Sequence, residues 1–250
     1  MDLIAYRAAA AAEKRSVEVT HIKTGKVKSF KHRTEFKEFL SSKGFEYKEL
    51  DYSIKDIQTA EPEEHAFQIV KSQVNSISQG LEADRLEGWI GGKDNFRLKL
   101  DLPKSYKGNR VDMLRPIHLD STKKYITNKY PGGLVQGREV DDQVVIRWHE
   151  LDAAGNEAVV VTLDKDQKAC IGTSYFDWTQ PKPKTVKVPP FGTLYWDKEK
   201  KKIDGLGLNF YCYQLLKGDS SDNYTPSDLH GFKFGDQSVL KLLKDCKDVN

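Results

Sequence analysis

Residues 158–166 read AVVVTLDKD, and this stretch decides the fold class because an apolar, mostly β-branched run ends at two aspartates. An unbroken run such as Ala158 to Leu163 is typical of a parallel strand that is buried on both faces. Segments with helical spacing of apolar residues precede and follow it, and helices that alternate with such strands favour an α/β sheet. The sequence therefore predicts an α/β protein with a buried strand over 158–163.

Asp164 and Asp166 stand two residues apart at the end of this strand. Side chains alternate along a strand, so both carboxylates are expected on one side and Lys165 on the other. Ligands of open α/β sheets gather at the carboxyl ends of strands, which makes the pair a candidate binding site. An Asp-x-Asp sequence after a strand is also common as a polar turn, so the pair alone does not establish a site.

Glu139, Asp141 and Asp142 form a second acidic cluster, at the start of a helix predicted over about 141–151. Glu139 and Asp142 are three residues apart and share one helical face. Acidic residues at a helix N-terminus also stabilise the helix dipole, which gives the cluster a purely structural explanation. Its role therefore depends on which other carboxylates the fold brings to it.

A third cluster lies in the loop GDSSDN, residues 218–223, where Asp219 and Asp222 are three residues apart. Such a loop either caps the following helix or holds a metal through a carboxylate and a water molecule. It lacks the alternating ligands, the central glycine and the terminal glutamate of an EF-hand. The spacing therefore excludes an EF-hand loop and leaves another kind of metal site open.

Carboxylates that share one site repel each other, and several of them take up protons unless cations are bound. Binding of Mg²⁺ or Mn²⁺ removes this repulsion. The three acidic clusters together therefore predict a site for two divalent metal ions, and no organic cofactor is expected.

The rest of the chain predicts short helices, strands and hairpins. Residues 17–30 alternate apolar and polar side chains around a Lys-Thr-Gly-Lys turn, which is typical of a β-hairpin. Further extended segments are expected at 86–90, where Gly91-Gly92 ends the strand, and in a hairpin that pairs 193–197 with 202–206. Helices are predicted over residues 2–14, 34–40, 62–81, 209–216 and 237–244.

Composition indicates a globular, water-soluble chain. Hydrophobic residues make up 38% and charged residues 31% of the 250 residues, and no apolar run is long enough to span a bilayer. The first residues lack the basic start and apolar core of a signal peptide, so we expect a cytoplasmic protein. Cys170, Cys212 and Cys246 are odd in number and widely spaced, which predicts buried or free thiols rather than a disulfide framework or a zinc site with close-set ligands.

The net charge of +3 conceals a segregation of charge. The acidic clusters lie among long stretches in which Lys and Arg dominate, above all between residues 95 and 130. A basic surface beside an acidic pocket suits a nucleic acid, whose phosphates are attracted by lysines before one of them reaches bound metals. A lysine-rich solvated surface explains the same composition, so charge alone leaves both interpretations open.

Five motifs stand in a defined order along the chain. They are Asp94 after a strand and Gly91-Gly92, Tyr106-Lys107-Gly108-Asn109-Arg110, Glu139-Val140-Asp141-Asp142, Thr162-Leu163-Asp164-Lys165-Asp166, and Gly218-Asp219-Ser220-Ser221-Asp222-Asn223-Tyr224. In this order they resemble the 5′ nuclease family, the flap endonucleases and 5′→3′ exonucleases, and most closely its bacteriophage members. The resemblance covers nearly the whole chain. It implies a PIN-like α/β core that carries metals, a basic helical arch, and a C-terminal helix–three-turn–helix element that grips duplex DNA.

The resemblance also implies roles for individual residues. The expected ligands of two Mg²⁺ or Mn²⁺ ions are Asp94, Glu139, Asp141, Asp142, Asp164, Asp166, Asp219 and Asp222. Tyr106 matches a residue that stacks on a base of the DNA, and Lys107 and Arg110 match residues that contact DNA and polarise the scissile phosphodiester. Cationic groups stabilise the charge that develops on the phosphoryl oxygens, so Lys107 and Arg110 are the expected catalytic residues.

Three parts are expected along the chain: a PIN-like nuclease core over 1–180 with the basic arch at about 95–130, a lysine-rich insertion over 181–204, and a helical DNA-gripping element over 205–250. In the family, a first strand that ends in an aspartate precedes the helix that begins here at Asp2. The resemblance therefore implies that the first strand is lacking and that the C-terminal element is shortened.

These expectations indicate divalent-metal-dependent hydrolysis of DNA phosphodiesters from a 5′ end or at a 5′ flap, by a two-metal mechanism in phage DNA metabolism. The expected partner is DNA, bound by a monomer in the host cytoplasm and without a membrane. A catalytically impaired DNA-binding protein of the same fold is one alternative, which the lacking aspartate favours. A PIN-type ribonuclease is another, because recognition of the 2′-hydroxyl is not visible in these motifs.

Overall fold

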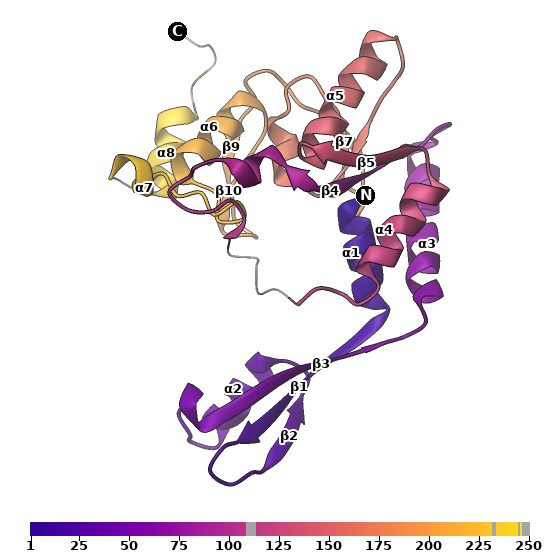
Figure 1. Ribbon diagram of the computed structural model, residues 1–250. Helices are drawn as coiled ribbons and strands as arrows, with labels where there is room; N and C mark the ends of the chain where they lie inside the picture. The colour runs from indigo at the N-terminus through magenta and orange to yellow at the C-terminus, as the bar shows by residue number, and fades with distance from the viewer. Residues whose placement is uncertain (109–113, 232–233, 245, 247–250) are drawn as a thin grey trace. The chain divides into compact units, whose positions relative to one another are not determined.

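The computed structural model describes residues 1–108, 114–231, 234–244 and 246 of the chain (Figure 1). It is a mixed α/β protein whose described strands form small sheets of two or three strands. The chain divides into two compact units: unit 1 comprises Met1–Ile90 with Leu114–Gly133, and unit 2 comprises Gly91–Met113 with Leu134–Asn250. None of the helices in the described residues combines the length and the apolar character that crossing a bilayer requires.

Three helices of unit 1 pack on one another: α1 (Asp2–Ala11), α3 (Glu63–Leu81) and α4 (Leu119–Lys129). Ala5, Ala8 and Ala9 of α1 are fully buried, and their small side chains let the other helices approach closely. The prediction of a helix over 62–81 is confirmed by α3. The helix predicted over 2–14 ends at Ala11 instead, because the chain becomes extended at Glu13.

Residues 13–60 of unit 1 form a three-stranded antiparallel sheet with one helix, here called the N-terminal module (Figure 1). Its elements are β1 (Glu13–His21), β2 (Val27–Phe30), α2 (Arg33–Ser42), the 3-10 helix η1 (Glu49–Asp51) and β3 (Tyr52–Ala60). The predicted hairpin and the helix predicted over 34–40 are confirmed. β3 was not predicted, because its apolar residues Ile54 and Ile57 are three apart and do not follow the strand period of two.

Glu13, the first residue of β1, holds two segments of unit 1 together. Its side chain is fully buried and accepts hydrogen bonds from the Ile117 amide at 2.9 Å, Arg15 at 2.5 Å and Gln58 at 3.2 Å. Burial alone would raise the pKa of Glu13, but these donors outweigh it and hold the pKa below its usual range. The carboxylate therefore stabilises the fold in its charged form.

We expect Glu13→Ala to lower the free energy of unfolding by about 1–3 kcal/mol at pH 7, because the three donors lose their acceptor. The pKa of Glu13 is depressed in the folded state, so its contribution is present above the ordinary value of 4.5 and is lost as the pH falls through the folded-state pKa. Urea unfolding at pH 7 and at about pH 3.5 measures this, with Glu18→Ala on the same strand as the control. An equal loss at both pH values contradicts the assignment.

Unit 2 contains the three acidic clusters. Its helices are α5 (Val140–Ala153), α6 (Gly207–Lys217), α7 (Ser227–His230) and α8 (Asp236–Leu243), with the 3-10 helices η2 (Phe96–Lys99) and η4 (Lys165–Ala169). Its strands are β6 (Val160–Val161), β7 (Ser174–Phe176), β8 (Thr185–Lys187), β9 (Leu194–Asp197) and β10 (Lys202–Gly205). The helices predicted at 141–151, 209–216 and 237–244 are confirmed by α5, α6 and α8, and the hairpin predicted at 193–206 is confirmed by β9 and β10.

The strand predicted over 158–163 is wrong in its length and burial. β6 covers only Val160 and Val161, pairs in parallel with β7, and buries Val160 alone. Beyond it, the Asp164 amide donates to the Thr162 hydroxyl at 3.0 Å, and the Asp164 carboxylate caps η4. These side-chain bonds satisfy backbone groups locally and turn the chain away from a sheet ladder.

The strand expected at 86–90 is also longer than predicted. β4 (Gly88–Asn95) pairs with β5 (Gly132–Gly137) and continues through Gly91-Gly92. A Cβ on Gly92 would lie 2.6 Å from the Val135 carbonyl oxygen, so the glycine allows close approach of the two strands rather than ending one.

The β9–β10 hairpin packs against α6 and α8 and fixes the position of η4. Leu194, Ile203 and Phe210 form a small core there. Asp204 of β10 is 5% exposed, and its carboxylate accepts from Lys168 of η4 at 2.6 Å. This partly buried ion pair connects η4, and with it Asp166, to the C-terminal half of unit 2. The three-part division at residues 180 and 204 stays a prediction.

Candidate metal centre

The loop after α6 places two of the predicted carboxylates. α6 ends at Gly218, whose φ of +89° is a conformation that other residues rarely adopt. Asp219 and Tyr224 then exchange two backbone hydrogen bonds of 2.9 and 2.8 Å, which close the loop. Inside it, the Ser221 amide donates to Asp219 Oδ1 at 2.8 Å. The Asp219 carboxylate is therefore held in one orientation.

Asp166, Asp219 and Asp222, here called the three-aspartate cluster, are brought together from η4 and this loop. One carboxylate oxygen of each lies within 4.8 Å of those of the other two. Gln214 of α6 donates to Asp166 Oδ1 at 2.6 Å, and Asp164 orients the same turn by accepting from the Asp166 amide at 3.0 Å. Sequence reasoning predicted the three aspartates as ligands; it did not predict Gln214, which no motif marks.

The carboxylates at the start of α5 line a cleft in the same unit, here called the acidic cleft. Its volume is about 440 Å³. Its charged lining residues are Arg97, Glu139, Asp141, Asp142, Asp164 and Asp166, and Val145, Val160 and Cys170 are among the others. Asp166 belongs both to this lining and to the three-aspartate cluster. Two groups of carboxylates therefore meet at Asp166.

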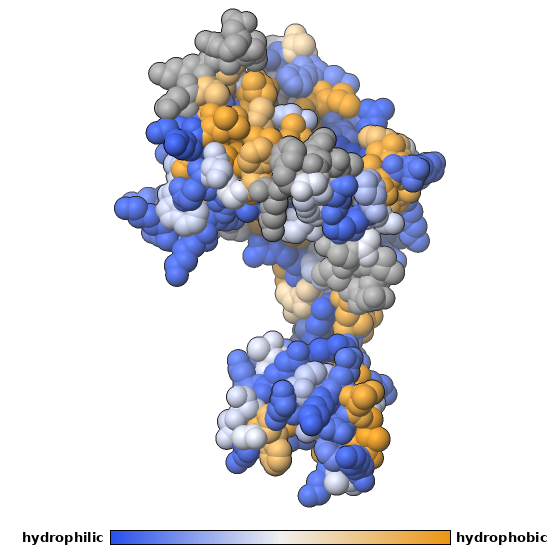
Figure 2. All heavy atoms as spheres, turned by 90° about the vertical axis from the view of Figure 1, so that its left-hand side faces the viewer, coloured by the Kyte–Doolittle hydropathy of each residue, from blue (hydrophilic) through white to orange (hydrophobic). Residues whose placement is uncertain are grey.

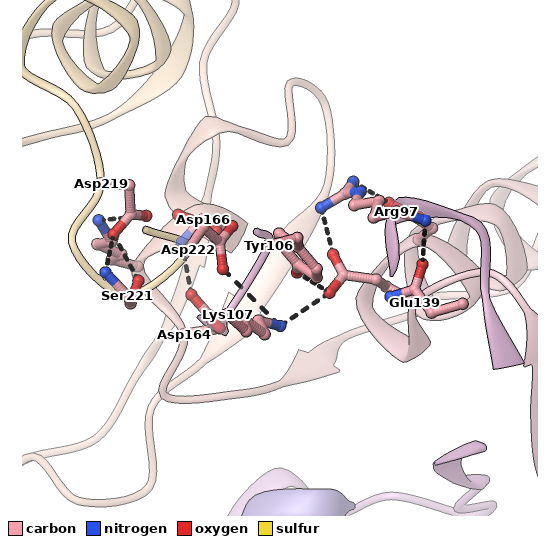
Figure 3. Close-up of polar contacts among 12 residues, drawn as sticks. Arg97, Tyr106, Lys107, Glu139, Asp164, Asp166, Asp219, Ser221 and Asp222 are labelled. Atoms are coloured by element: carbon pink, nitrogen blue, oxygen red, sulfur yellow. Dashed lines mark hydrogen bonds and ion pairs between the residues drawn. The ribbon is translucent and has the colours of Figure 1, made fainter. Parts of the chain in front are cut away.

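Positively charged side chains lie between these carboxylates (Figure 3). Lys107 Nζ is 2.8 Å from Glu139 Oε1 and 3.8 Å from Asp222 Oδ1, so it connects the start of α5 with the loop after α6. Arg97 and the Tyr106 hydroxyl also donate to Glu139. Lys107 has a φ of +54°, which is uncommon for a residue with a side chain. The segment is therefore held in an unfavourable conformation by its contacts.

Backbone contacts fix Lys107 beside Asp222. The Lys107 amide donates to the Asp222 carbonyl at 3.4 Å, and the Asn223 side chain donates to the Ser105 carbonyl at 3.0 Å. The Tyr106 ring is half-buried, with Lys107 Nζ 4.7 Å and Arg97 Cζ 5.9 Å from its centroid. In this arrangement Tyr106 contacts cations and Glu139, and its predicted stacking on a base stays a prediction.

The strand alternation predicted for residues 164–166 is absent, and Lys165 contacts Asp219 of the three-aspartate cluster. Its Nζ is 2.8 Å from Asp219 Oδ2, whereas strand alternation predicted only that Lys165 would point away from Asp164 and Asp166. The prediction is wrong because residues 165–169 form the 3-10 helix η4, in which side chains do not alternate. Arg97, a second cation that sequence reasoning did not assign to the site, bonds both Glu139 and Asp142.

Two further predicted residues lie elsewhere or outside the described residues. Asp94 on β4 is exposed, is paired with Lys99 at 3.0 Å, and belongs neither to the acidic cleft nor to the three-aspartate cluster. Arg110 lies outside the described residues. Within residues 95–130 the described helices are η2 and α4, and the described residues 100–108 and 114–118 between them contain no α-helix. The helical arch expected at about 95–130 stays a prediction.

The pKa values show how strongly the carboxylates interact. The pKa of Asp141 is raised to about 6. Partial loss of hydration is the largest cause, and the negative charges of Asp164 and Glu139 add to it. Desolvation, followed by the charge of Asp164, also raises the pKa of Asp166. For Asp219, hydrogen bonds from Lys165 and Ser221 outweigh desolvation, and its pKa lies below the usual range. Burial would also raise the pKa of Glu139, but its contacts with Lys107, Tyr106 and Arg97 lower it below its usual range. The neighbouring donors therefore favour the charged form of Asp219 and Glu139, whereas the pKa values of Asp141 and Asp166 stay raised.

The donor atoms of the three-aspartate cluster suit Mg²⁺ or Mn²⁺. All three ligands are carboxylates, which hard divalent cations prefer over softer metals. Oxygen ligands of these ions lie roughly 2.0–2.3 Å from the metal, so oxygens on opposite sides of one ion are about 4–5 Å apart. The 4.8 Å limit on the oxygen separations is compatible with a single ion bound by all three residues.

A comparison with models of protein families finds no match, and no curated protein is significantly similar to this chain. Among solved structures, a chain described as T5 D15 protein co-crystallised with metal ions is similar to it, with a TM-score of 0.49 and 16% sequence identity. The match covers 70% of this chain and 66% of that chain, which is just under two thirds of its length. The function of this chain is therefore inferred from its own residues.

We expect Gly218→Ala to weaken Mn²⁺ binding at least tenfold. A Cβ at this position would lie 2.6 Å from Pro226 Cδ and 2.8 Å from the Tyr224 carbonyl oxygen, so the loop that carries Asp219 and Asp222 must shift. Titration calorimetry with Mn²⁺ measures the affinity. Gly155→Ala is the matched control, because Gly155 also has a positive φ, of +79°, but no atom within 4 Å of the added Cβ. Equal affinities for the two variants contradict the role of the loop.

Proposed function

We propose that this chain is a divalent-metal-dependent 5′ nuclease that hydrolyses DNA phosphodiesters from a 5′ end or at a 5′ flap in phage DNA metabolism. One observation supports the proposal above all: η4 and the loop after α6 bring three aspartates within 4.8 Å, and a lysine bridges this cluster to the carboxylates of α5. In hydrolysis of a phosphodiester, carboxylates would bind the metal ions, and a lysine beside them would bind the negatively charged phosphate.

Each residue of the site would have a separate task in this reaction. Divalent cations bound by the carboxylates would activate the attacking water and stabilise the leaving 3′ oxygen. Asp166, Asp219 and Asp222 would hold the cation, and Gln214 and Ser221 keep two of these carboxylates in place. The carboxylates of the acidic cleft would take part in holding a second ion.

Lys107 would act on the phosphodiester itself. Its pKa is raised, because the hydrogen bond and the charge of Glu139 outweigh the desolvation of its ammonium group, so it stays charged at neutral pH. A charged donor in a partly desolvated site stabilises the negative charge that develops on phosphoryl oxygens. Arg110 is proposed for the same task, and the helices of residues 205–250 are proposed to contact the backbone of duplex DNA.

We expect Asp166→Asn to reduce cleavage of a 5′-labelled flap duplex at least 100-fold while binding of the duplex in EDTA changes little. Asparagine keeps the shape of the side chain but removes the charge that would hold a cation. Asp152→Asn, an exposed change at the end of α5, is the matched control and should cleave normally. Cleavage is measured in Mg²⁺ and Mn²⁺ against EDTA.

The outcomes of this experiment separate the alternatives. Cleavage that persists in EDTA, or that survives in Asp166→Asn, contradicts the proposed site. Metal-dependent binding of the duplex without cleavage by the unmodified protein would identify a DNA-binding protein without activity. Faster cleavage of an RNA strand of the same sequence would identify a ribonuclease.

Lys107→Gln is expected to slow single-turnover cleavage by roughly 100-fold, as removal of one charged donor does in other enzymes. Duplex affinity should fall much less, because a single phosphate contact contributes little to total binding. Lys107→Arg should recover part of the rate, and Lys99→Gln, at an exposed lysine paired with Asp94, should have the normal rate. An equal loss of rate and affinity would assign Lys107 to binding alone.

A further inference from the structure

The N-terminal module contains a cleft of about 790 Å³ that the proposed nuclease site does not use. This volume lies within the range of about 300–1,000 Å³ that binding sites for organic ligands occupy. The floor of the cleft consists of the buried side chains Val19, Phe30, Phe36 and Leu40, which come from β1, β2 and α2. The cleft therefore has an apolar floor on a rigid sheet and helix.

Positive charge gathers around this cleft. Residues 21–48 contain eight Lys and Arg against three Asp and Glu, a net charge of +5, whereas the whole chain has +3. Four lysines and a histidine line the cleft, against Glu46 and Asp51: Lys26, Lys28, Lys43, Lys48 and His21. Among the residues that the structure describes, none of these four lysines forms an ion pair, while Asp51 is 4.0 Å from Lys23. The cleft is therefore suited to an anionic ligand.

Aromatic rings form a continuous set of contacts beside the lysines. Phe30 contacts Phe36 and Phe39 with ring centroids 5.2 and 5.5 Å apart, and Phe36 contacts Tyr52 at 5.0 Å. Lys28 Nζ lies 3.7 Å from the centroid of Phe39. Phe45, which also lines the cleft, is 65% exposed. An exposed ring next to lysines offers a stacking surface and phosphate contacts in one place.

Figure 2 shows the module, in the lower part of the view, with a surface that is mostly hydrophilic and with a hydrophobic strip at one side. Phe45 and Val27, exposed at 65% and 57%, are cleft-lining residues of apolar character. Their position between lysines indicates a ligand with both flat apolar groups and negative charges.

We propose that this cleft binds an unpaired strand of nucleic acid, with bases against Phe45 and the apolar floor and phosphates on Lys26, Lys28, Lys43 and Lys48. A single strand presents each base face to a partner, whereas a duplex hides its bases in the stack and offers mainly phosphates. The inference rests on the proposed function for the identity of the strand, namely the unpaired part of a 5′ nuclease substrate. The binding itself does not depend on cleavage.

An acidic protein segment is the main competing ligand. Such a segment would need its negative charges at one end or along one face, whereas the four lysines are spread over the β1–β2 turn, β2, the residue after α2 and the loop before η1. Charge that is distributed around an apolar cleft suits a chain with one phosphate per base. The nucleic acid is therefore the ligand that the lining favours.

The test is binding of a fluorescently labelled oligothymidylate to the full chain in EDTA, measured by anisotropy. Lys26→Gln/Lys43→Gln should weaken binding roughly tenfold or more. Lys14→Gln/Lys55→Gln is the matched control, because it removes two exposed lysines of the same module outside the cleft lining, and its affinity should change less than twofold. Equal losses in both variants would reduce the effect to net charge and overturn the proposal.

Phe45→Ala tests the stacking contact separately and should weaken oligothymidylate binding about 5- to 100-fold. Leu50→Ala, at a residue that is 91% exposed and outside the cleft lining, should bind normally. Unchanged affinity in Phe45→Ala, or binding of a labelled acidic peptide without binding of the oligonucleotide, overturns the proposal. Because binding is measured without metal, a failure of cleavage alone contradicts the proposed function and leaves this inference standing.

Discussion

Mutual repulsion among carboxylates is the constraint on which the arrangement of unit 2 depends. The acidic cleft and the three-aspartate cluster contain seven acidic residues, and among the residues that the structure describes Arg97, Lys107 and Lys165 form ion pairs with them. Three positive charges do not offset seven negative ones. The pKa of Asp141 is raised to about 6, first by burial and then by the charges of Asp164 and Glu139. Divalent cations are the chemically simplest way to complete the balance, because each contributes two charges and accepts several oxygens.

Local backbone structure keeps these carboxylates together against their repulsion. Gly218 permits the tight loop that carries Asp219, and the 3-10 helix η4 turns Asp166 toward it. The partly buried ion pair of Lys168 and Asp204 anchors η4 to the β9–β10 hairpin. Charge is also distributed unequally over the chain: residues 21–48 have a net charge of +5, and all other residues together have −2.

Sequence patterns predicted those parts of the structure that depend on local spacing. The helix α3 followed from apolar residues three and four apart, and the turn at Lys23 to Lys26 fixed the β1–β2 hairpin. Patterns failed where side-chain hydrogen bonds determine the backbone conformation. Asp164 caps η4 next to the short strand β6, so residues 164–166 do not alternate as in a strand and Lys165 contacts Asp219. The contact of Arg97 with Glu139 joins residues 42 positions apart, and no local pattern encodes such a distance.

The most direct test of the central claim is a crystal structure of the chain grown with Mn²⁺, in which anomalous scattering locates the metal. We expect an anomalous peak bonded to Asp166, Asp219 and Asp222, with carboxylate oxygens at about 2.0–2.3 Å, and a second peak beside the carboxylates of the acidic cleft. Lys165 or Lys107 should then move away from the carboxylate it contacts here. Absence of a peak at the three-aspartate cluster at millimolar Mn²⁺, with both lysines still in place, would contradict the account.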